Sequence, residues 1–280
     1  MTVRKLARQA RTIPTAVALG CGLAAFVGMV AVVAPILAPY DAFKMAVGPR
    51  LSAPSVLHLF GTDEFGRDLF SRVLMGTRFS LGVGLVAVLC GLAIGGFLGF
   101  AAAFSGRYVE MLILRVIDVL YSFPDILIAL ALLAFLGPGI ENATFAIAAS
   151  LVPFYARVTY ALSAGEKAKS YLEAARLAGI GPVRLIRVHL LPNISQSVIA
   201  MATLGFSSAI LSSAGLSFLG LGVQPPSPEW GAMLASGRNY LTKAPWILLF
   251  PGCAICVTVI AFNMIGDGLH DWFDPRRKLH

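Results

Sequence analysis

The sequence predicts an all-α, polytopic membrane protein that crosses the bilayer six times. Of its 280 residues, 58% are hydrophobic and only 13% are charged, and the mean hydropathy is +0.81. A soluble domain usually carries about 25% charged residues, so the surface of this chain suits lipid better than water. Apolar runs of roughly 20 residues, long enough to cross about 30 Å of hydrocarbon as helices, recur along the chain.

Six apolar runs account for the expected spans. They are Thr15–Leu37, Ser80–Phe104, Val116–Leu136, Ala143–Leu162, Val198–Leu219 and Trp246–Ile265. The first run follows a basic N-terminal stretch, as the apolar part of a signal peptide would. It is longer than the roughly 7–15 apolar residues of a signal sequence, so we expect an uncleaved membrane anchor.

The distribution of Lys and Arg predicts the orientation of the spans. Most of the 22 basic residues fall in segments that are cytoplasmic if the N-terminus is cytoplasmic, and short cytoplasmic loops are enriched in Lys and Arg. Both termini are therefore expected in the cytoplasm. The external segment 38–79 fits this rule least, because five basic residues lie in it. The net charge of +8 is explained by topology and by contact with anionic lipid, and no nucleic-acid partner is expected.

Small residues form stripes on two of the expected spans. Gly91, Gly95 and Gly99 recur every four residues along the second span. Such a stripe lets the backbone of a neighbouring helix approach closely in lipid. Serines recur on the fifth span, at positions 208, 212 and 213. We expect these faces to pack helices together, and the alternative is that they line a water-filled path.

Four ionisable residues lie within or at the end of the spans, where a charge is costly unless it is paired or faces a cavity. Arg115 and Asp118 are three residues apart and are expected to pair on one helix face, in preference to a proton relay. Asp125 follows Pro124, which removes a helical hydrogen bond and is expected to bend the third span. Whether Asp125 lines a pathway or serves packing stays open, and Asp267 ends the sixth span.

The segment between the fourth and fifth spans reads SYLEAARLAGIGPVRLIRVHLLPN over residues 170–193. Ser170 and Glu173 have the S-x-x-E spacing of a capping box, which predicts a helix starting at Tyr171. Gly179 is placed to end that helix in a left-handed turn. The segment is therefore predicted to be a short, stiff helical element on the cytoplasmic side.

A second short helix is expected after the turn. Pro182 suits the first turn of a helix, and Val183, Ile186 and Leu190 then share one face. Pro192 is expected to end or kink this helix before the fifth span. The two helices would form a rigid helix–turn–helix knob that can transmit a push from a neighbouring protein into the fourth and fifth spans.

Patterns typical of enzymes and metal sites are weak or missing in the sequence. Cys253 and Cys256 have a C-x-x-C spacing, but a single pair without a nearby histidine is weak evidence for redox or metal chemistry. The phosphate-binding pattern G-x-x-x-x-G-K-[ST] does not occur. No catalytic, cofactor-binding or metal-binding residue is therefore expected, and the four cysteines are interpreted as packing residues.

Several motifs resemble those of bacterial ABC importer permeases. The spacing of six residues matches the EAA loop of that family: Glu173, Ala174, Ala175, Gly179, Leu191 and Pro192. Further segments are similar to the peptide/nickel branch, namely FGTDEFGRDLFSRVL (60–74), SFPDILIAL (122–130), SFLGLGVQPPSPEWGAML (217–234), APWILLFPG (244–252) and AFNMIGDGLHDWFDPR (261–276). The likeness covers about residues 55–276 and is most specific for the C-type permease of a dipeptide or oligopeptide importer.

This resemblance implies a set of partners and roles. The chain would pair with a homologous B-type permease, two ATPase domains that hold ATP and Mg, and an extracytoplasmic solute-binding protein. The helix that starts near Ser170 would be the coupling helix, with Glu173 at its cap and Ala174 and Ala175 keeping it slim enough for a groove in an ATPase. The resemblance also suggests that Asp267 ties the sixth span to the knob or to the ATPase.

The same resemblance suggests how the chain is divided. Residues 1–79 would hold the N-terminal tail, the first span and an external segment. Residues 80–270 would form the ABC transporter type-1 transmembrane domain, with the coupling loop at about 163–195, and residues 271–280 a cytoplasmic tail. The segment 60–70, with glycines and acids at positions 61, 63, 66 and 68, would either dock the binding protein or brace the partner permease.

The function expected from the sequence is ATP-driven import of di- or oligopeptides across the bacterial cytoplasmic membrane by alternating access. The chain itself is not expected to be an enzyme. Nickel chelates, glutathione-like peptides or opines remain alternatives as cargo for the same machinery. A secondary transporter is a more distant alternative, because such proteins show paired internal repeats and buried ion-coupling residues, and no duplicated half is visible in this sequence.

Overall fold

The computed structural model describes residues 15–181 and 184–273. Within these residues the chain is helical and forms no β-strand, apart from one isolated bridge between Thr62 and Asp68. The elements are α2 (Thr15–Leu37), α3 (Leu69–Phe104), α4 (Arg107–Tyr121), α5 (Asp125–Leu136), α6 (Ile140–Lys167), α7 (Ser170–Leu177), the π-helical turn η1 (Leu185–Leu190), α9 (Leu191–Phe218), α10 (Trp230–Gly237), the 3₁₀ turn η2 (Arg238–Tyr240) and α11 (Trp246–Phe273).

Five of these helices are long and apolar enough to cross a membrane: α2, α3, α6, α11 and the continuous helix Leu185–Phe218. The pair α4 and α5 makes a sixth candidate, but its two halves are bent by 89°. The expected bend at Pro124 is confirmed, and it is sharp enough to break the helix between Tyr121 and Asp125. The break has a local cause, because proline lacks an N–H and disfavours helical geometry in the preceding residue.

Most spans extend further than their apolar sequence suggests. α3 begins at Leu69, well before the expected Ser80, and the expected domain boundary at residue 79 falls inside it. The Asp68 side chain caps this helix by accepting a hydrogen bond from the backbone N–H of Ser71 at 2.8 Å. An apolar run marks only the part of a helix that faces lipid, because the two ends of the helix can extend into polar surroundings.

α3 packs closely against α6 along the glycine stripe. The sequence predicted a close helix contact there but not which helix would make it. Gly91, Gly95 and Gly99 are all buried. A Cβ atom on Gly95 would lie 2.5 Å from the carbonyl oxygen of Val152, and one on Gly99 would lie still closer to that of Ala156. The two backbones could not approach this closely with any larger residue, so the stripe is confirmed as a packing surface.

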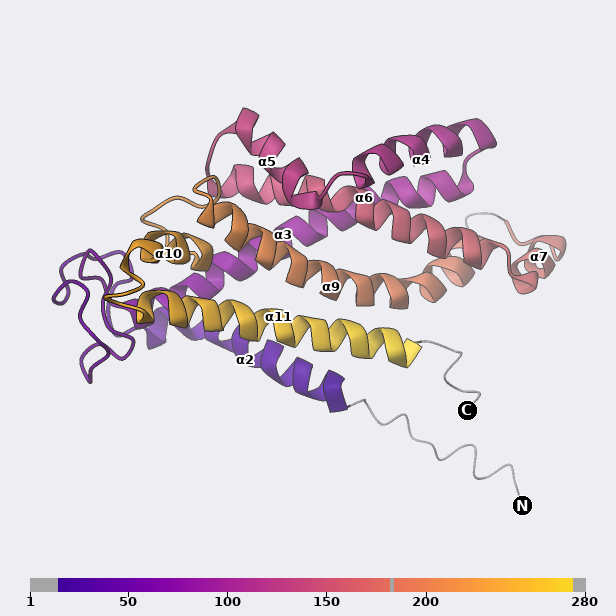
Figure 1. The fold of residues 1–280 in the computed structure, drawn as a ribbon. Helices are drawn as coiled ribbons and strands as arrows, with labels where there is room; N and C mark the ends of the chain where they lie inside the picture. Colours follow the sequence, from indigo (N-terminus) through magenta and orange to yellow (C-terminus); the bar gives the residue numbers. More distant parts are fainter. Residues whose placement is uncertain (1–14, 182–183, 274–280) are drawn as a thin grey trace, which may run out of the picture.

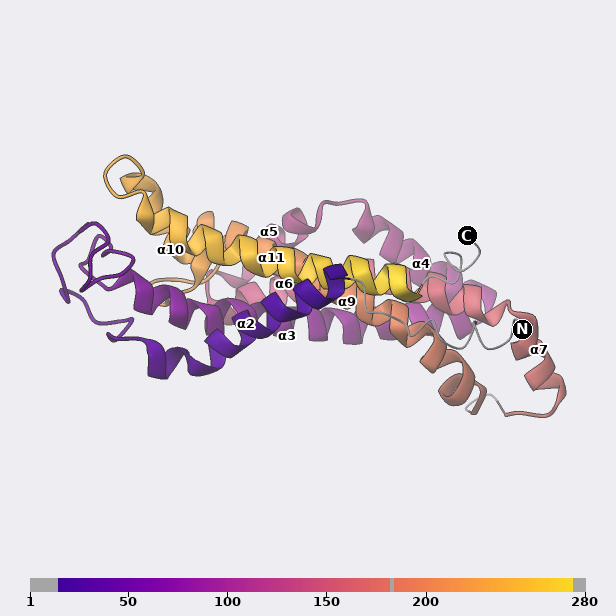
Figure 2. The ribbon, with the colours of Figure 1, turned by 90° about the horizontal axis from the view of Figure 1, so that it is seen from below.

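The elements at the two ends of the molecule differ in kind (Figure 1). One end carries α10 and the long segment between α2 and α3, and the other carries α7. Both views place α7 beyond the first residue of α2 and the last turn of α11 (Figure 2). The helix ends that lead to the N- and C-termini therefore point the same way as α7, the arrangement expected if the termini and the knob share one side of the membrane.

Candidate functional site

The turn after α7 has the geometry that the sequence predicted. Gly179 has a φ of +82°, which only glycine adopts without strain. The backbone N–H of Ile180 donates to the carbonyl oxygen of Ala175 at 3.1 Å, the six-to-one bond of a Schellman motif. α7 itself begins at Ser170, one residue before the expected Tyr171.

α7 rests on a small hydrophobic cluster of its own. Leu172, Leu185, Leu190 and Ile194 are buried together, and Ile180 packs against them. The opposite face of the knob is open: Glu173 and Ala174 are exposed, and Leu177 is 85% exposed. This cluster therefore holds α7 on one face, while Glu173, Ala174 and Leu177 stay exposed on the other.

A hydrogen-bond network that the sequence did not suggest ties α7 to both neighbouring spans. The Tyr171 hydroxyl donates to Glu166 at 2.6 Å, at the end of α6. The Asn193 side chain, at the start of α9, donates to the Tyr171 hydroxyl at 2.8 Å. Partial burial, followed by the bond to Glu166, raises the pKa of Tyr171. The knob cannot rotate freely, because the Tyr171 side chain joins it to α6 and α9 at once.

The expected second helix of the knob is not a separate element. Pro182 and Val183 lie outside the described residues, and Leu185–Leu190 forms a π-helical turn that continues directly into α9. The Leu191 N–H donates to the carbonyl oxygen of Ile186, five residues back. The prediction that Pro192 ends the helix was wrong, because the helix runs on to Phe218. The alternative that Pro192 kinks it stays a prediction, at the junction where a π-helical turn passes into α9. Leu191 and Pro192 are both exposed there.

The expected pair of Arg115 and Asp118 does not form. Asp118 instead accepts a hydrogen bond from Arg157 of α6 at 2.6 Å. Arg115 is exposed and forms no ion pair with any residue of the described chain. The i, i+3 spacing allowed the local pair, but α4 runs beside α6 and offers Asp118 a guanidinium in a better position.

Asp125 faces a cavity of about 430 Å³ that lies between α4, α5, α6 and α9. Its carboxylate is exposed, and Oδ1 accepts a hydrogen bond from the backbone N–H of Ile126 at 2.8 Å. Ser208 lines the same cavity, whereas Ser213 is buried at 3.5 Å from Glu229. Ser208 thus lines a cavity, whereas Ser213 packs against another part of the chain. The two roles that the sequence left open, lining a path and packing helices, fall to different serines of α9.

Asp267 is exposed on α11 and forms no ion pair within residues 15–181 and 184–273. A contact with the knob or with an ATPase stays a prediction. Among the described residues, no group of three or more His, Cys, Asp or Glu side chains could hold a metal ion.

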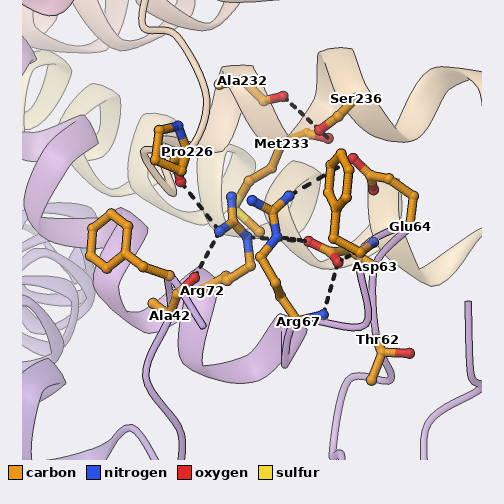
Figure 3. Close-up of polar contacts among 12 residues, drawn as sticks. Ala42, Thr62, Asp63, Glu64, Arg67, Arg72, Pro226, Ala232, Met233 and Ser236 are labelled. Carbon is orange, nitrogen blue, oxygen red and sulfur yellow. Dashed lines mark hydrogen bonds and ion pairs between the residues drawn. The ribbon is translucent and has the colours of Figure 1, made fainter. Parts of the chain in front are cut away.

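Two acids of segment 60–70, Asp63 and Glu64, lie beside the guanidinium groups of Arg67 and Arg72 (Figure 3). Asp63 pairs with Arg67 at 2.5 Å and lies 3.6 Å from Arg72, and all three side chains are buried. Arg72 also donates to the carbonyl oxygen of Ala42 at 2.7 Å. These carboxylate and guanidinium groups hold segment 38–79 onto the start of α3. They are buried in these contacts, so they do not form a docking surface themselves.

The third acid of this segment, Asp68, is also tied to its neighbours. Asp68 is fully buried, and its Oδ1 lies 2.9 Å from Nδ1 of His58. Its Oδ2 accepts from both the N–H and the hydroxyl of Ser71. Two of the five basic residues that fitted the orientation rule least, Arg67 and Arg72, are buried in this region, and their charge is balanced locally.

Glu229 is a buried residue to which the sequence assigned no role. It is 1% exposed and caps α10 by accepting from the backbone N–H of Ala232 at 2.8 Å. Its other oxygen lies 3.4 Å from the hydroxyl of Ser80 and 3.5 Å from that of Ser213. Burial without a cationic partner raises the pKa of this carboxyl. It joins α3, α9 and α10 at the end opposite the knob.

Comparisons with known proteins agree with this architecture. The family model of the binding-protein-dependent transport system inner membrane component matches residues 91–279. A dipeptide transport system permease protein of Alkalihalophilus pseudofirmus is 45% identical over 250 residues, which cover 89% of this chain and 82% of that protein. A di/tripeptide transport system permease protein of Pseudomonas aeruginosa is 47% identical, with coverage of 89% and 84%. Among solved structures, an inward-facing MetNI methionine ABC transporter matches the fold with a TM-score of 0.60 at 19% identity, over 73% of this chain and 97% of that chain.

Proposed function

The chain belongs to the family of binding-protein-dependent transport system inner membrane components, and from this premise we propose that it is the C-type permease of an ATP-driven peptide importer. As a member of that family it is a multi-pass permease subunit of an ABC importer in the inner membrane. Two relatives are named for dipeptide and di/tripeptide transport, which supports di- and oligopeptides as the cargo.

The observation that carries this proposal is the rigid attachment of α7. The Schellman turn at Gly179, the cluster around Leu172 and the bonds of Tyr171 fix the helix to α6 and α9. A groove on an ATPase that receives the exposed face of α7 could therefore move two spans by moving one short helix. In a flexible loop, the same displacement would be absorbed by local motion and would not reach the spans.

In this mechanism the ATPase subunits bind ATP and Mg, and the permease subunit hydrolyses nothing. Closure of the ATPase pair draws the knobs of the two permeases together and tilts α6 and α9 from an inward-open to an outward-open arrangement. Cargo delivered by the extracytoplasmic binding protein then enters between this chain and a homologous B-type permease. Hydrolysis and release of the nucleotide reset the cycle, and α3 to α11 form the transporting core.

The knob supplies a direct test of coupling. Glu173→Arg places the wrong charge on the exposed face of α7, and Gly179→Val strains a backbone at φ +82°. Both variants should insert normally and hydrolyse ATP in the assembled complex, while peptide uptake per ATP falls severalfold. Gly181→Val is the matched control, because no atom lies within 4 Å of a Cβ at that position. Wild-type uptake by either knob variant would contradict the coupling role.

Reconstitution separates this function from the secondary transporter that the sequence left as an alternative. The chain with its B-type partner, ATPases and binding protein should accumulate labelled dipeptides in vesicles only with ATP. Uptake by the chain alone, driven by an ion gradient, would overturn the proposal. Growth of a deletion strain on defined peptides, compared with growth that depends on nickel chelates or glutathione, identifies the cargo.

A further inference from the structure

α4 lies on the outside of the bundle and has two exposed faces of opposite character. Figure 1 shows it beside the half of α6 that leads to α7, on the side of the bundle away from α2 and α11. Within α4 only Ile117 is buried. The apolar face carries Leu112 and Val116, which are 67% and 54% exposed. The charged face borders a groove of about 470 Å³, whose wall is formed by Arg107, Glu110, Met111, Leu114, Arg115 and Asp118.

The charged face of α4 is tied to α6 by two polar contacts. Arg157 of α6 donates to the Asp118 carboxylate at 2.6 Å, and the two side chains are 50% and 46% exposed. The Tyr160 hydroxyl of α6 donates to the Glu110 carboxylate. Both acids of the groove therefore have a partner on α6, and this half of α4 is held in place beside that helix.

The charged face extends well into the span that α4 and α5 form. Asp118 lies about 16 Å further along the helix than Arg107, at about 1.5 Å per residue. Ionised side chains inside a span are costly unless they are paired or face a water-filled space, and Arg115 forms no ion pair within residues 15–181 and 184–273. An anionic lipid surface would attract the arginines but repel Glu110 and Asp118. Water is therefore the surrounding that suits the whole face.

The groove continues into the cavity that Asp125 lines. The wall of the groove ends at Asp118, and the wall of the cavity begins at Leu120 and Tyr121 of the same helix. At its other end the groove reaches Arg107, the first residue of α4, and this end of α4 points toward α7 (Figure 1). The two hollows thus follow one another along α4, from the bend to the end of the molecule that carries α7.

We infer that the charged face of α4 forms one wall of the water-filled path by which the cargo leaves the permease for the cytoplasm, a step that rests on the proposed function. The path runs from the cavity at the bend along the groove, while the apolar face of α4 is turned away from water. The wall carries charges of both signs, so a peptide with an ammonium and a carboxylate group meets several weak contacts in place of one strong one. Weak contacts at several positions let the cargo leave, as transport requires.

Met111 and Leu112 provide a matched pair of probes. They are neighbours at nearly the same depth and are 47% and 67% exposed in this chain, but of the two only Met111 lines the groove. The four native cysteines, all exposed, are first replaced. In the assembled transporter in inside-out vesicles, Met111→Cys should react with a charged, membrane-impermeant thiol reagent.

Leu112→Cys should react roughly tenfold more slowly or less, because a thiol in apolar surroundings ionises poorly and the reagent does not enter lipid. After denaturation in detergent both thiols should react alike, which shows that each was present and intact.

The attached reagent also tests whether cargo uses the groove. A charged group on the thiol of Met111→Cys stands in the path, so ATP-driven peptide uptake should fall severalfold compared with the same variant before treatment. Treatment of Leu112→Cys should leave its uptake unchanged. ATP hydrolysis by the treated complexes is the control for damage to the ATPases.

The outcomes separate this inference from the proposed function. If the wild-type complex shows no ATP-driven peptide uptake, the proposed function fails and the path falls with it, whatever the labelling pattern. If wild-type uptake is normal, then equal labelling of the two thiols, labelling of Leu112→Cys alone or labelling of neither overturns only the path along α4. Labelling of Met111→Cys without loss of uptake would reveal a wet groove that the cargo does not use, and that result overturns the path as well.

Discussion

At the scale of single residues, the buried acids of this chain fall into two groups. Asp63 is balanced by Arg67 and a backbone N–H, and Asp68 contacts His58 and accepts hydrogen bonds from Ser71, so both carboxyl groups are satisfied within segment 38–79. Glu229 is buried just as deeply but meets only hydroxyls and backbone donors. An uncompensated carboxylate prefers its neutral form in such surroundings.

Glu229 should therefore make the stability of the protein depend on pH. Its folded-state pKa lies above the ordinary value of 4.5, so the folded state binds the proton more tightly than the unfolded state does. Its contribution to stability is fully present below 4.5 and is lost as the pH rises through the folded pKa. Glu229→Gln keeps an acceptor at the α10 cap but cannot ionise.

The measurement is the Tm of the detergent-solubilised protein from about pH 5 to about pH 8. The Tm of the wild type should fall relative to that of Glu229→Gln as the pH rises. Subtracting the two curves removes groups common to both proteins, including Glu64, whose pKa is also raised mainly by burial. Parallel curves of Tm against pH would show that ionisation of Glu229 does not destabilise the folded protein.

At the scale of helices, α3 and α6 carry the closest backbone contact in the bundle, and glycine permits it. Gly95 faces the carbonyl oxygen of Val152, which belongs to a helix backbone and cannot swing aside. Gly82 lies on the same helix, and no atom is found within 4 Å of a Cβ placed there. The same helix thus contains Gly95, which the close packing requires, and Gly82, which could be a larger residue without affecting the packing.

Gly95→Val should consequently destabilise the bundle, whereas Gly82→Val should not. Overpacking of a close contact typically costs about 1–3 kcal/mol, and the backbone obstacle at Gly95 places this variant at the upper end. Thermal unfolding in detergent and the yield of monodisperse protein provide the measurement. Equal Tm values for the two variants would mean that α3 and α6 can separate without penalty.

At the scale of the whole molecule, the two ends of the bundle have different architecture. The end with α10 contains buried ion pairs and the buried Glu229, and it holds the folded segment 38–68. The other end presents α7 on a small cluster of its own. Coupling to an ATPase requires these ends to lie on opposite sides of the membrane, with α7 in the cytoplasm.

Cysteine labelling tests this orientation. Val56 is 96% exposed in the external segment, and Ala174 is exposed on α7. The native cysteines at positions 21, 90, 253 and 256 are all exposed and free, so they must first be replaced. In intact cells a membrane-impermeant thiol reagent should modify Val56→Cys and leave Ala174→Cys unmodified until the membrane is opened. The reverse pattern would invert the topology and remove the proposed contact with the ATPase.

Local chemistry made much of the fold predictable from the sequence. Gly179 and Pro124 act through the backbone of their immediate neighbours, so the turn after α7 and the break in the third span could be inferred without the rest of the chain. The apolar runs predicted the spans, because lipid imposes the same requirement wherever the helix finally packs. The glycines of α3 likewise predicted that another helix packs closely against this span. The sequence did not show which helix that would be.

Only the tertiary structure decided which side chains meet. Asp118 pairs with Arg157 and not with its sequence neighbour, Tyr171 joins two spans, and two acids of segment 60–70 lie beside buried guanidinium groups. The cavity that Asp125 lines is built from four elements. Backbone preferences and hydropathy are properties of short segments and can be read from them. Ion pairs and cavities depend on the relative positions of distant helices, and packing alone sets those positions.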